Sequence, residues 1–305
     1  MFNTALTLIC NPAAPTIDAK VLSAIRGWLK SWASGGIERV ILRNGVAVDF
    51  LFNTDMNLQA AQRTAAIALR GLDIDVAIQP TAHRRKKLLI ADMDSTIIEQ
   101  ECIDELAEFV GKRAEISDIT ERAMRGELDF EAALKERVAM LKGLSAKHLE
   151  AAFRERITLT PGAKMVIQTM RARGAFTALV SGGFTFFTER VAAAAGFDVN
   201  EANQLMMAQA SLTGEVGEPV LGRAAKEEAL RRHAAAQSVK LTETIAVGDG
   251  ANDLSMLASA GLGVAFRAKP AVADAADVSI QYGDLTALLY LQGIAYKEFA
   301  DVRKA

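Results

Sequence analysis

Two aspartates, Asp92 and Asp94, follow directly on the apolar run at residues 88–91. Carboxylates beside a buried strand cost free energy unless a cation or hydrogen-bond donors compensate their charge. Side chains at positions i and i+2 of a strand share one face, so we expect these two carboxylates to converge on one site. Asp249 comes just after another aliphatic run, at 245–247. Three carboxylates suit a hard, oxygen-coordinated cation, and they therefore predict a Mg²⁺ site.

A potential anion-binding loop also follows directly on an apolar run. Ser181-Gly182-Gly183 follows the apolar run 178–180 and precedes a helical pattern. A serine hydroxyl and the backbone amides of a helix N-terminus can hold an anion. Lys226, near the start of another predicted helix, can add a positive charge. A cation, an anion cradle and carboxylates together meet the requirements of phosphoryl transfer.

Short aliphatic strands alternate with helical patterns from residue 88 onward, which predicts an α/β domain with a doubly wound parallel sheet. The predicted strands span residues 88–91, 178–180, 245–247, 261–266 and 278–280. Such sheets bind their ligands beyond the carboxyl ends of the strands, and the motifs above lie at those ends. The three histidines, at positions 83, 148 and 233, are too scattered to indicate a zinc site.

A helical segment of about 60 residues, roughly 99–158, separates the first motif from the second strand. Its predicted helices cover about 102–110, 114–125, 129–142 and 146–156. Inserted at this point of the chain, the segment is expected to form a cap that covers the site and excludes water.

The first 80 residues follow a different pattern. Strands and helices occur in the order β-α-β-β-α-β, and Asn44-Gly45 between two β-type runs indicates a hairpin. This order predicts a small ferredoxin-like α+β domain at 1–80. It resembles ACT-type domains, which often bind amino acids. The other interpretation is that this domain is a structural or dimerising module, through which the protein would form a homodimer. We expect the domain to be dispensable for the chemistry.

Residues 81–87 form the expected linker to the domain at 88–305. The basic cluster His83-Arg84-Arg85-Lys86-Lys87 within it is interpreted as a solvated approach to the next strand rather than as a nucleic-acid contact.

Composition excludes several classes of protein. The chain has 305 residues, half of them hydrophobic and 24% charged, so disorder is excluded and about two domains are expected. A formal net charge of −2 provides no field that would attract nucleic acid or an acidic membrane. Cys10 and Cys102 are interpreted as packing residues of a protein in a reducing compartment. No run reaches the roughly 20 apolar residues of a membrane span, and we expect a cytoplasmic protein.

Four motifs in order resemble those of the haloacid dehalogenase superfamily of phosphohydrolases, and within it those of the phosphoserine phosphatases. The matching segments are Asp92-Met93-Asp94-Ser95-Thr96, Ser181-Gly182-Gly183-Phe184, Lys226 and Gly248-Asp249-Gly250-Ala251-Asn252-Asp253. The resemblance runs from about residue 88 to the end of the chain.

The resemblance implies a role for each matched residue. Asp92 would be the nucleophile, and Asp94 the general acid and base. Mg²⁺ would be held by Asp92, by Asp249 and by the backbone carbonyl of Asp94. The phosphoryl oxygens would be held by Ser181, Gly182 and Lys226. The intermediate would be contacted by Asn252, and the metal shell would be braced by Asp253.

The cap also resembles that of the phosphoserine phosphatases. Glu101 corresponds to the residue that binds the substrate ammonium, and Arg137 to the one that binds its carboxylate, which suits a planar guanidinium. Met124 and Phe130 correspond to apolar residues that close over the substrate, with plain core packing as the alternative.

The implied activity is Mg²⁺-dependent hydrolysis of the small molecule O-phosphoserine through an aspartyl phosphate, the last step of serine biosynthesis. Two alternatives remain open at this point. One is a phosphatase of the same fold that acts on another small phosphomonoester. The other is an amino-acid-sensing protein whose phosphatase half is vestigial. A dinucleotide-binding dehydrogenase is excluded because no GxGxxG motif follows a strand.

Overall fold

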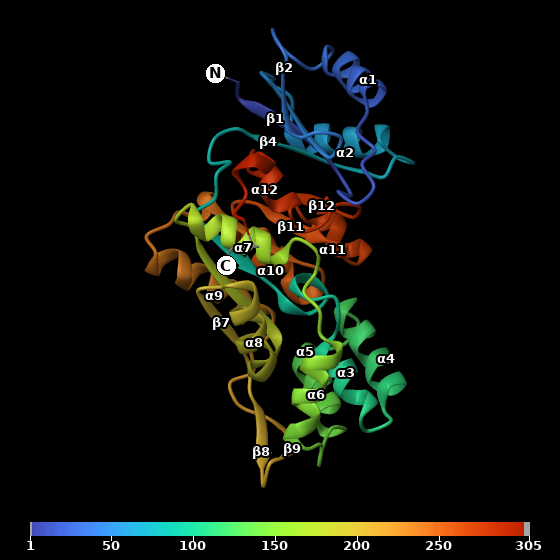
Figure 1. The fold of residues 1–305 in the computed structure, drawn as a ribbon, viewed down its shortest axis with the longest axis vertical. Coiled ribbons are helices and arrows are strands. Elements are labelled where there is room, and N and C mark those ends of the chain that lie inside the picture. The colour runs from blue at the N-terminus through green and yellow to red at the C-terminus, as the bar shows by residue number, and fades with distance from the viewer. Residues whose placement is uncertain (1, 302–305) are drawn as a thin grey trace.

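The computed structural model describes residues 2–301. An antiparallel sheet, a parallel sheet and a group of cap helices follow one another along the long axis of the molecule (Figure 1). The same view shows the amino-terminal sheet at one end and the cap at the other, with the parallel sheet between them.

The amino-terminal domain has the predicted ferredoxin-like topology. Its elements are β1 (Thr4–Cys10), α1 (Ala19–Leu29), β2 (Glu38–Arg43), β3 (Ala47–Phe52), α2 (Leu58–Ala68) and β4 (Ile74–Pro80). The strand order β2-β3-β1-β4 is antiparallel throughout, and the predicted Asn44-Gly45 hairpin joins β2 to β3. Side chains from both helices share one apolar core with the facing side of the sheet. The topology is therefore confirmed, whereas the resemblance to ACT-type domains stays a prediction.

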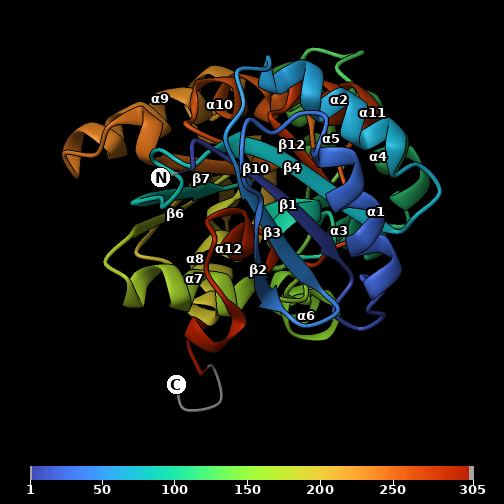
Figure 2. The ribbon, with the colours of Figure 1, turned by 90° about the horizontal axis from the view of Figure 1, so that it is seen from above.

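The opposite face of this sheet packs on the core of the larger domain. Seen from above, β1 and β4 lie across β12 (Val278–Ile280) and α12 (Ala287–Leu291) (Figure 2). Asp75 on β4 is buried there and accepts hydrogen bonds from the backbone amides of residues 281–283. A buried carboxylate satisfied by three amides fixes the position of one domain on the other.

Two members of the basic cluster at residues 83–87 are largely buried, so its interpretation as a solvated segment is wrong for them. Arg84 makes a bidentate contact with Asp49, at 2.6 and 2.8 Å. Lys86 is 8% exposed and donates to the carbonyl oxygens of Thr242 and Gly261. These partners lie far away in the sequence, which is why the local pattern of charges did not predict the burial.

The larger domain contains the predicted doubly wound parallel sheet. Its strands are β5 (Leu88–Ala91), β6 (Phe176–Phe184), β7 (Val199–Asn203), β10 (Thr244–Gly248), β11 (Gly263–Phe266) and β12, in the order β12-β11-β10-β5-β6-β7. Leu88 and Ile90 point into one apolar cluster, and Leu89 and Ala91 into another. Each face is therefore covered, as a continuous apolar strand requires.

The helices divide between the two faces. One face carries α9 (Arg223–Ala236), α10 (Leu254–Ser259) and α11 (Pro270–Ala275), and the other α7 (Ala163–Ala172), α8 (Thr185–Ala195) and α12. The chain runs outward from β5 through β6 to β7 and then returns to place β10 on the other side of β5. The carboxyl ends of β5 and β10 therefore flank the point at which the strand order reverses, where such sheets bind ligands.

The cap consists of α3 (Cys102–Glu108), α4 (Arg113–Met124), α5 (Phe130–Ala139) and α6 (Ala146–Arg156), close to the predicted ranges. The hairpin β8 (Leu205–Ala208) and β9 (Ser211–Val216) packs on α5 and was not predicted. The amide of Gly143 donates to the carbonyl of Leu212 at 2.9 Å, so the hairpin ties the cap to the core. The strand β7 was also missed, because its sequence is largely polar.

Cys10 and Cys102 are both buried, and neither forms a disulfide; their interpretation as packing residues stays a prediction. Between residues 2 and 301, none of the helices combines the length and the apolar character needed to cross a bilayer.

Candidate active site

A tight turn places the first two aspartates. Strand β5 ends at Ala91, and the chain then turns through Met93–Ile97, with Ser95 at φ 55°. Asp92 and Asp94 therefore do not share one face of a strand, as the i, i+2 argument expected. They face the same cavity nonetheless, because the turn redirects the backbone between them.

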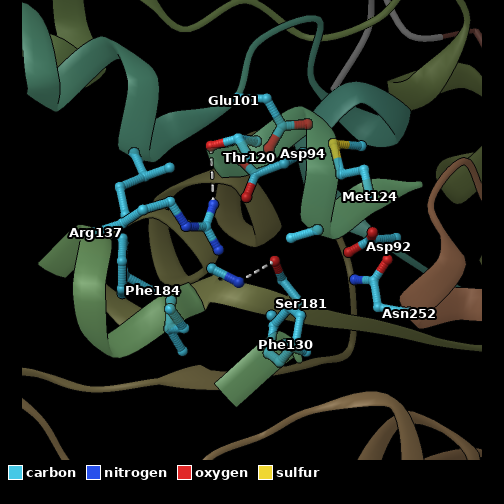
Figure 3. Close-up of a pocket in the computed structure, with 15 residues that line it drawn as sticks. Asp92, Asp94, Glu101, Thr120, Met124, Phe130, Arg137, Ser181, Phe184 and Asn252 are labelled. Atoms are coloured by element: carbon cyan, nitrogen blue, oxygen red, sulfur yellow. Dashed lines mark hydrogen bonds between the residues drawn. The ribbon is translucent and has the colours of Figure 1, made fainter. Parts of the chain in front are cut away.

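This cavity lies between the carboxyl ends of the strands and the cap (Figure 3). Its polar and charged lining comes from Asp92, Asp94, Glu101, Thr120, Arg137, Ser181 and Asn252. Its apolar lining includes Ile103, Ala123, Met124, Phe130, Leu134 and Phe184. Gly182, Met124 and Phe130, which the sequence analysis singled out, thus line the cavity.

Asp92 is held from two sides at the base of the cavity. Its carboxylate contacts Lys226 Nζ at 2.8 Å and accepts from the amide of Met93 at 2.7 Å. Burial raises the pKa of Asp92 to about 7, and the Asp253 carboxylate adds to that effect, while Lys226 opposes it. The group is thus a buried carboxylate whose charge depends on a cation beside it.

Lys226, from the first turn of α9, is completely buried. It lies beneath the cavity lining, where Nζ contacts Asp253 at 2.7 Å as well as Asp92. Burial alone would lower the pKa of Lys226, but the Asp253 and Asp92 carboxylates raise it. A lysine whose charged form is favoured by two carboxylates therefore stands directly behind Asp92.

Three buried carboxylates, those of Asp92, Asp249 and Asp253, each offer an oxygen within 4.8 Å of the others. Asp253 accepts from the amides of Asp249 and Gly250, each at 3.1 Å, so its orientation is fixed by the loop itself. Thr96 donates to Asp249 at 3.0 Å. Burial raises the pKa of Asp249 well above its usual value. A cluster of this kind suits a divalent cation.

The predicted metal set and this cluster differ in one member. The side chain of Asp94 is not part of the cluster, and its expected contribution through a backbone carbonyl stays a prediction. Asp253 supplies the third carboxylate, although its oxygens are already engaged by Lys226 and by two amides.

Asp94 lies on the other side of the cavity floor. It accepts from the amide of Cys102 at 3.2 Å, and burial raises its pKa to about 7. A Cβ on Gly183 would lie 2.6 Å from Asp94 Oδ2, so this glycine leaves room for the carboxyl group. Ser181 Oγ accepts from the Gly183 amide at 2.9 Å and thereby closes the loop into a compact cradle.

The cap side of the cavity carries one acidic and one basic group. Glu101 accepts from Ser95 Oγ at 2.6 Å, and burial together with Asp94 raises its pKa to about 8. Arg137, on α5, is 6% exposed, and burial lowers its pKa. A carboxyl group and a guanidinium on one side of a cavity suit a ligand that carries both an amine and an acid.

Residues that the sequence argument missed also line the cavity, Thr120 foremost among them. Thr120 precedes Met124 by one turn of α4, so the two side chains share a face. That spacing was the available signal, since Met124 was already placed at the site.

A model of the haloacid dehalogenase-like hydrolase family matches residues 89–258, more than half of the chain. The chain belongs to this family. A family relative, the phosphoserine phosphatase of Streptomyces coelicolor, is 44% identical over 241 residues, which make up 79% of this chain and 58% of the relative. The chain spans between 55% and 63% of the length of this relative and of those from Archaeoglobus fulgidus and Mycobacterium tuberculosis.

Two solved structures of the family are similar to the fold described above. One, described as a phospho-aspartyl intermediate analogue of phosphoserine phosphatase, is 42% identical with a TM-score of 0.65 and covers 68% of this chain and 98% of its own. The other, a haloacid dehalogenase family hydrolase from Salmonella enterica serovar Typhi, is 29% identical with a TM-score of 0.82. It covers 94% of this chain and 98% of its own, so the likeness includes the amino-terminal domain.

Proposed function

We propose that the chain is a phosphoserine phosphatase, which hydrolyses O-phosphoserine to serine and phosphate. One observation carries the proposal: a single cavity is lined by Asp92, which is paired with the buried Lys226, and by Glu101 and Arg137 of the cap. The first pair suits a phosphoryl group, and the second suits the ammonium and carboxylate of an amino acid. The names of several relatives at 41% to 46% identity support the same substrate.

The proposed reaction has two steps. An oxygen of Asp92 forms a bond to phosphorus while the bond from phosphorus to the serine oxygen breaks. Asp94 gives its proton to that oxygen, which is why a carboxyl group with a raised pKa suits this position. Water then attacks the aspartyl phosphate, Asp94 takes up its proton, and Asp92 and free phosphate are released.

Charge explains why the site needs a cation. Two unit negative charges about 4 Å apart repel by about 4 kcal/mol at an effective dielectric of about 20. Lys226 offsets part of this repulsion where it contacts Asp92. Mg²⁺ would be held by Asp92, Asp249 and the backbone carbonyl of Asp94, with Asp253 bracing them. When bound, it would neutralise charge on the phosphoryl oxygens.

The remaining residues position the substrate. Ser181 and Gly182, with Lys226, would hold phosphoryl oxygens, and Asn252 would contact the intermediate. The proposed amino-acid end lies in the cap, where Glu101 would bind the ammonium and Arg137 the carboxylate. Met124 and Phe130, which line the same cavity, would cover the bound molecule and exclude water.

The test compares two substrates. Glu101→Gln and Arg137→Ala should lower kcat/KM for phosphoserine about 100-fold or more, because each leaves a charged substrate group unpaired. Both variants should lower kcat/KM for p-nitrophenyl phosphate much less. Arg154→Ala, at an exposed cap arginine, is the matched control and should change neither. Equal losses on both substrates would instead favour a phosphatase for another phosphomonoester.

Asp92→Asn tests the enzyme hypothesis itself. It should abolish Mg²⁺-dependent phosphate release while the melting temperature stays close to that of the wild type. A folded wild-type protein that releases no phosphate would favour the amino-acid-sensing alternative. The boundaries of the amino-terminal domain at 1–80, a homodimer formed through this domain and a cytoplasmic location stay predictions. Size-exclusion chromatography with light scattering tests the dimer.

A further inference from the structure

Arg137 is held within the cap by two hydrogen bonds. Nε donates to the carbonyl of Ala133 at 3.0 Å, and Nη1 donates to Thr120 Oγ1 at 3.0 Å. Within residues 2–301, Nη2 has no hydrogen-bond partner. The guanidinium carries five N–H groups, so three remain for a ligand in the cavity.

Thr120 is 3% exposed, and the hydrogen-bond roles of its hydroxyl follow from its partners. An arginine only donates, so Oγ1 accepts from Arg137 and must direct its own hydrogen elsewhere. Two acceptors lie at 2.9 Å, namely Asp104 Oδ1 and the carbonyl of Ile116. The carboxylate is the stronger acceptor, because charge-assisted hydrogen bonds exceed neutral ones in strength.

Asp104, on α3, is itself held in place. Its Oδ2 accepts from Ser117 Oγ at 2.7 Å, so each carboxylate oxygen has a partner on α4. The chain of contacts therefore runs from Asp104 on α3 through Thr120 on α4 to Arg137 on α5. This chain of contacts links three cap helices and ends at the guanidinium, which lies beside the labelled Thr120 at the cavity (Figure 3).

We propose that Thr120 and Asp104 are positioning residues, which orient Arg137 for a carboxylate on the substrate. Neither needs to touch the substrate. Asp104 directs the Thr120 hydrogen away from Arg137, and the lone pair of Thr120 then holds Nη1 so that the free hydrogens face the cavity. This inference rests on the proposed function, because it takes the ligand of Arg137 to be a carboxylate.

The experiment compares O-phosphoserine with O-phosphoethanolamine, which retains the amine but lacks the carboxylate. Thr120→Val should raise KM for phosphoserine roughly 10-fold with a small change in kcat, because a hydrogen bond to a charged group is lost. It should leave kcat/KM for phosphoethanolamine within about twofold. Thr120→Ser retains the hydroxyl and should behave as the wild type. Thr64→Val, which removes a similar helix hydroxyl from α2, should change neither substrate.

Asp104→Asn tests the second contact. It should raise KM for phosphoserine about threefold, and combining it with Thr120→Val should add nothing, since both act through one path. Additive effects, or equal losses on both substrates, would overturn the inference. If Thr120→Val does not fold, Asp104→Asn is compared with the wild type on the same two substrates. An unchanged KM of Asp104→Asn for phosphoserine would then overturn the inference.

The measurements on the wild-type enzyme distinguish a failure of this inference from a failure of the proposed function. A wild-type enzyme without preference for phosphoserine over phosphoethanolamine would overturn the proposed function and this inference together. A wild-type preference that Thr120→Val leaves intact would overturn the inference alone.

Discussion

Arg84 lies where the amino-terminal sheet meets the larger domain, and replacing it with methionine tests whether the two domains are fixed together. The side chain of Arg84 is 10% exposed and that of its partner Asp49 is 3% exposed. Arg84 also donates to the carbonyl of Leu291 at 2.8 Å and to Thr7 Oγ1 at 2.7 Å. Arg84→Met would therefore leave the Asp49 carboxylate buried with no ion-pair partner.

Removing one member of a buried ion pair costs about 3–5 kcal/mol, because the remaining charge is uncompensated. At about 2–4 °C per kcal/mol, the melting temperature should fall by roughly 6–20 °C. Differential scanning calorimetry measures this shift. The double variant Arg84→Met with Asp49→Asn should recover part of it, since no charge is then left buried. Below the transition, kcat/KM should remain that of the wild type, because no residue before Asp92 lines the cavity.

Either of two stability results would refute the reasoning about the buried pair. A fall of under about 2 °C for Arg84→Met would mean that the pair contributes no more than an exposed one. A double variant less stable than Arg84→Met would mean that the buried charge is not the cause. A loss of turnover in folded Arg84→Met would contradict the expectation that the amino-terminal domain is dispensable for the chemistry.

Three further predictions follow from the site and its surroundings. Gly183→Ala should lower turnover about 100-fold or more without unfolding, because its Cβ would lie 2.6 Å from Asp94 Oδ2; unchanged kinetics would contradict this. A hydrogen bond from His233 helps to lower the pKa of Glu201 to about 2. The stability that ionised Glu201 adds to the fold should therefore be lost as the pH falls from about 4.5 to about 2. The free energy of unfolding of Glu201→Gln should lack this dependence on pH. An acid unfolding profile of Glu201→Gln identical to that of the wild type would contradict the prediction. Chelation should stop turnover and Mg²⁺ should restore it in the wild type but not in Asp249→Asn; full activity with chelator would exclude a metal.

Features set by neighbouring residues were predicted well. The order of the amino-terminal elements follows from local periodicity and from the Asn44-Gly45 turn, and the structure confirms it. The four cap helices also begin within about two residues of their predicted starts. Asp129 caps α5 by accepting from the amide of Ala132, as an aspartate before a helix predicts.

Other features depend on partners that lie far away in the sequence. The run at 199–203 is too polar to indicate a strand, and only pairing with β6 makes it one. The hairpin that ties the cap to the core likewise depends on contacts with α5 and with the loop at 143–146.

Residue type and order along the chain were enough to predict which chemistry is present, because the carboxylates and the glycine loop follow predicted strands and Lys226 lies near the start of a predicted helix. Tertiary structure alone decided which charges are buried. The residues next to Lys226 and Arg84 in the sequence do not distinguish them from exposed cations. Each is nevertheless buried against carboxylates from distant segments. The physical reason is that a charge leaves water only where partners compensate it, and the fold brings those partners together.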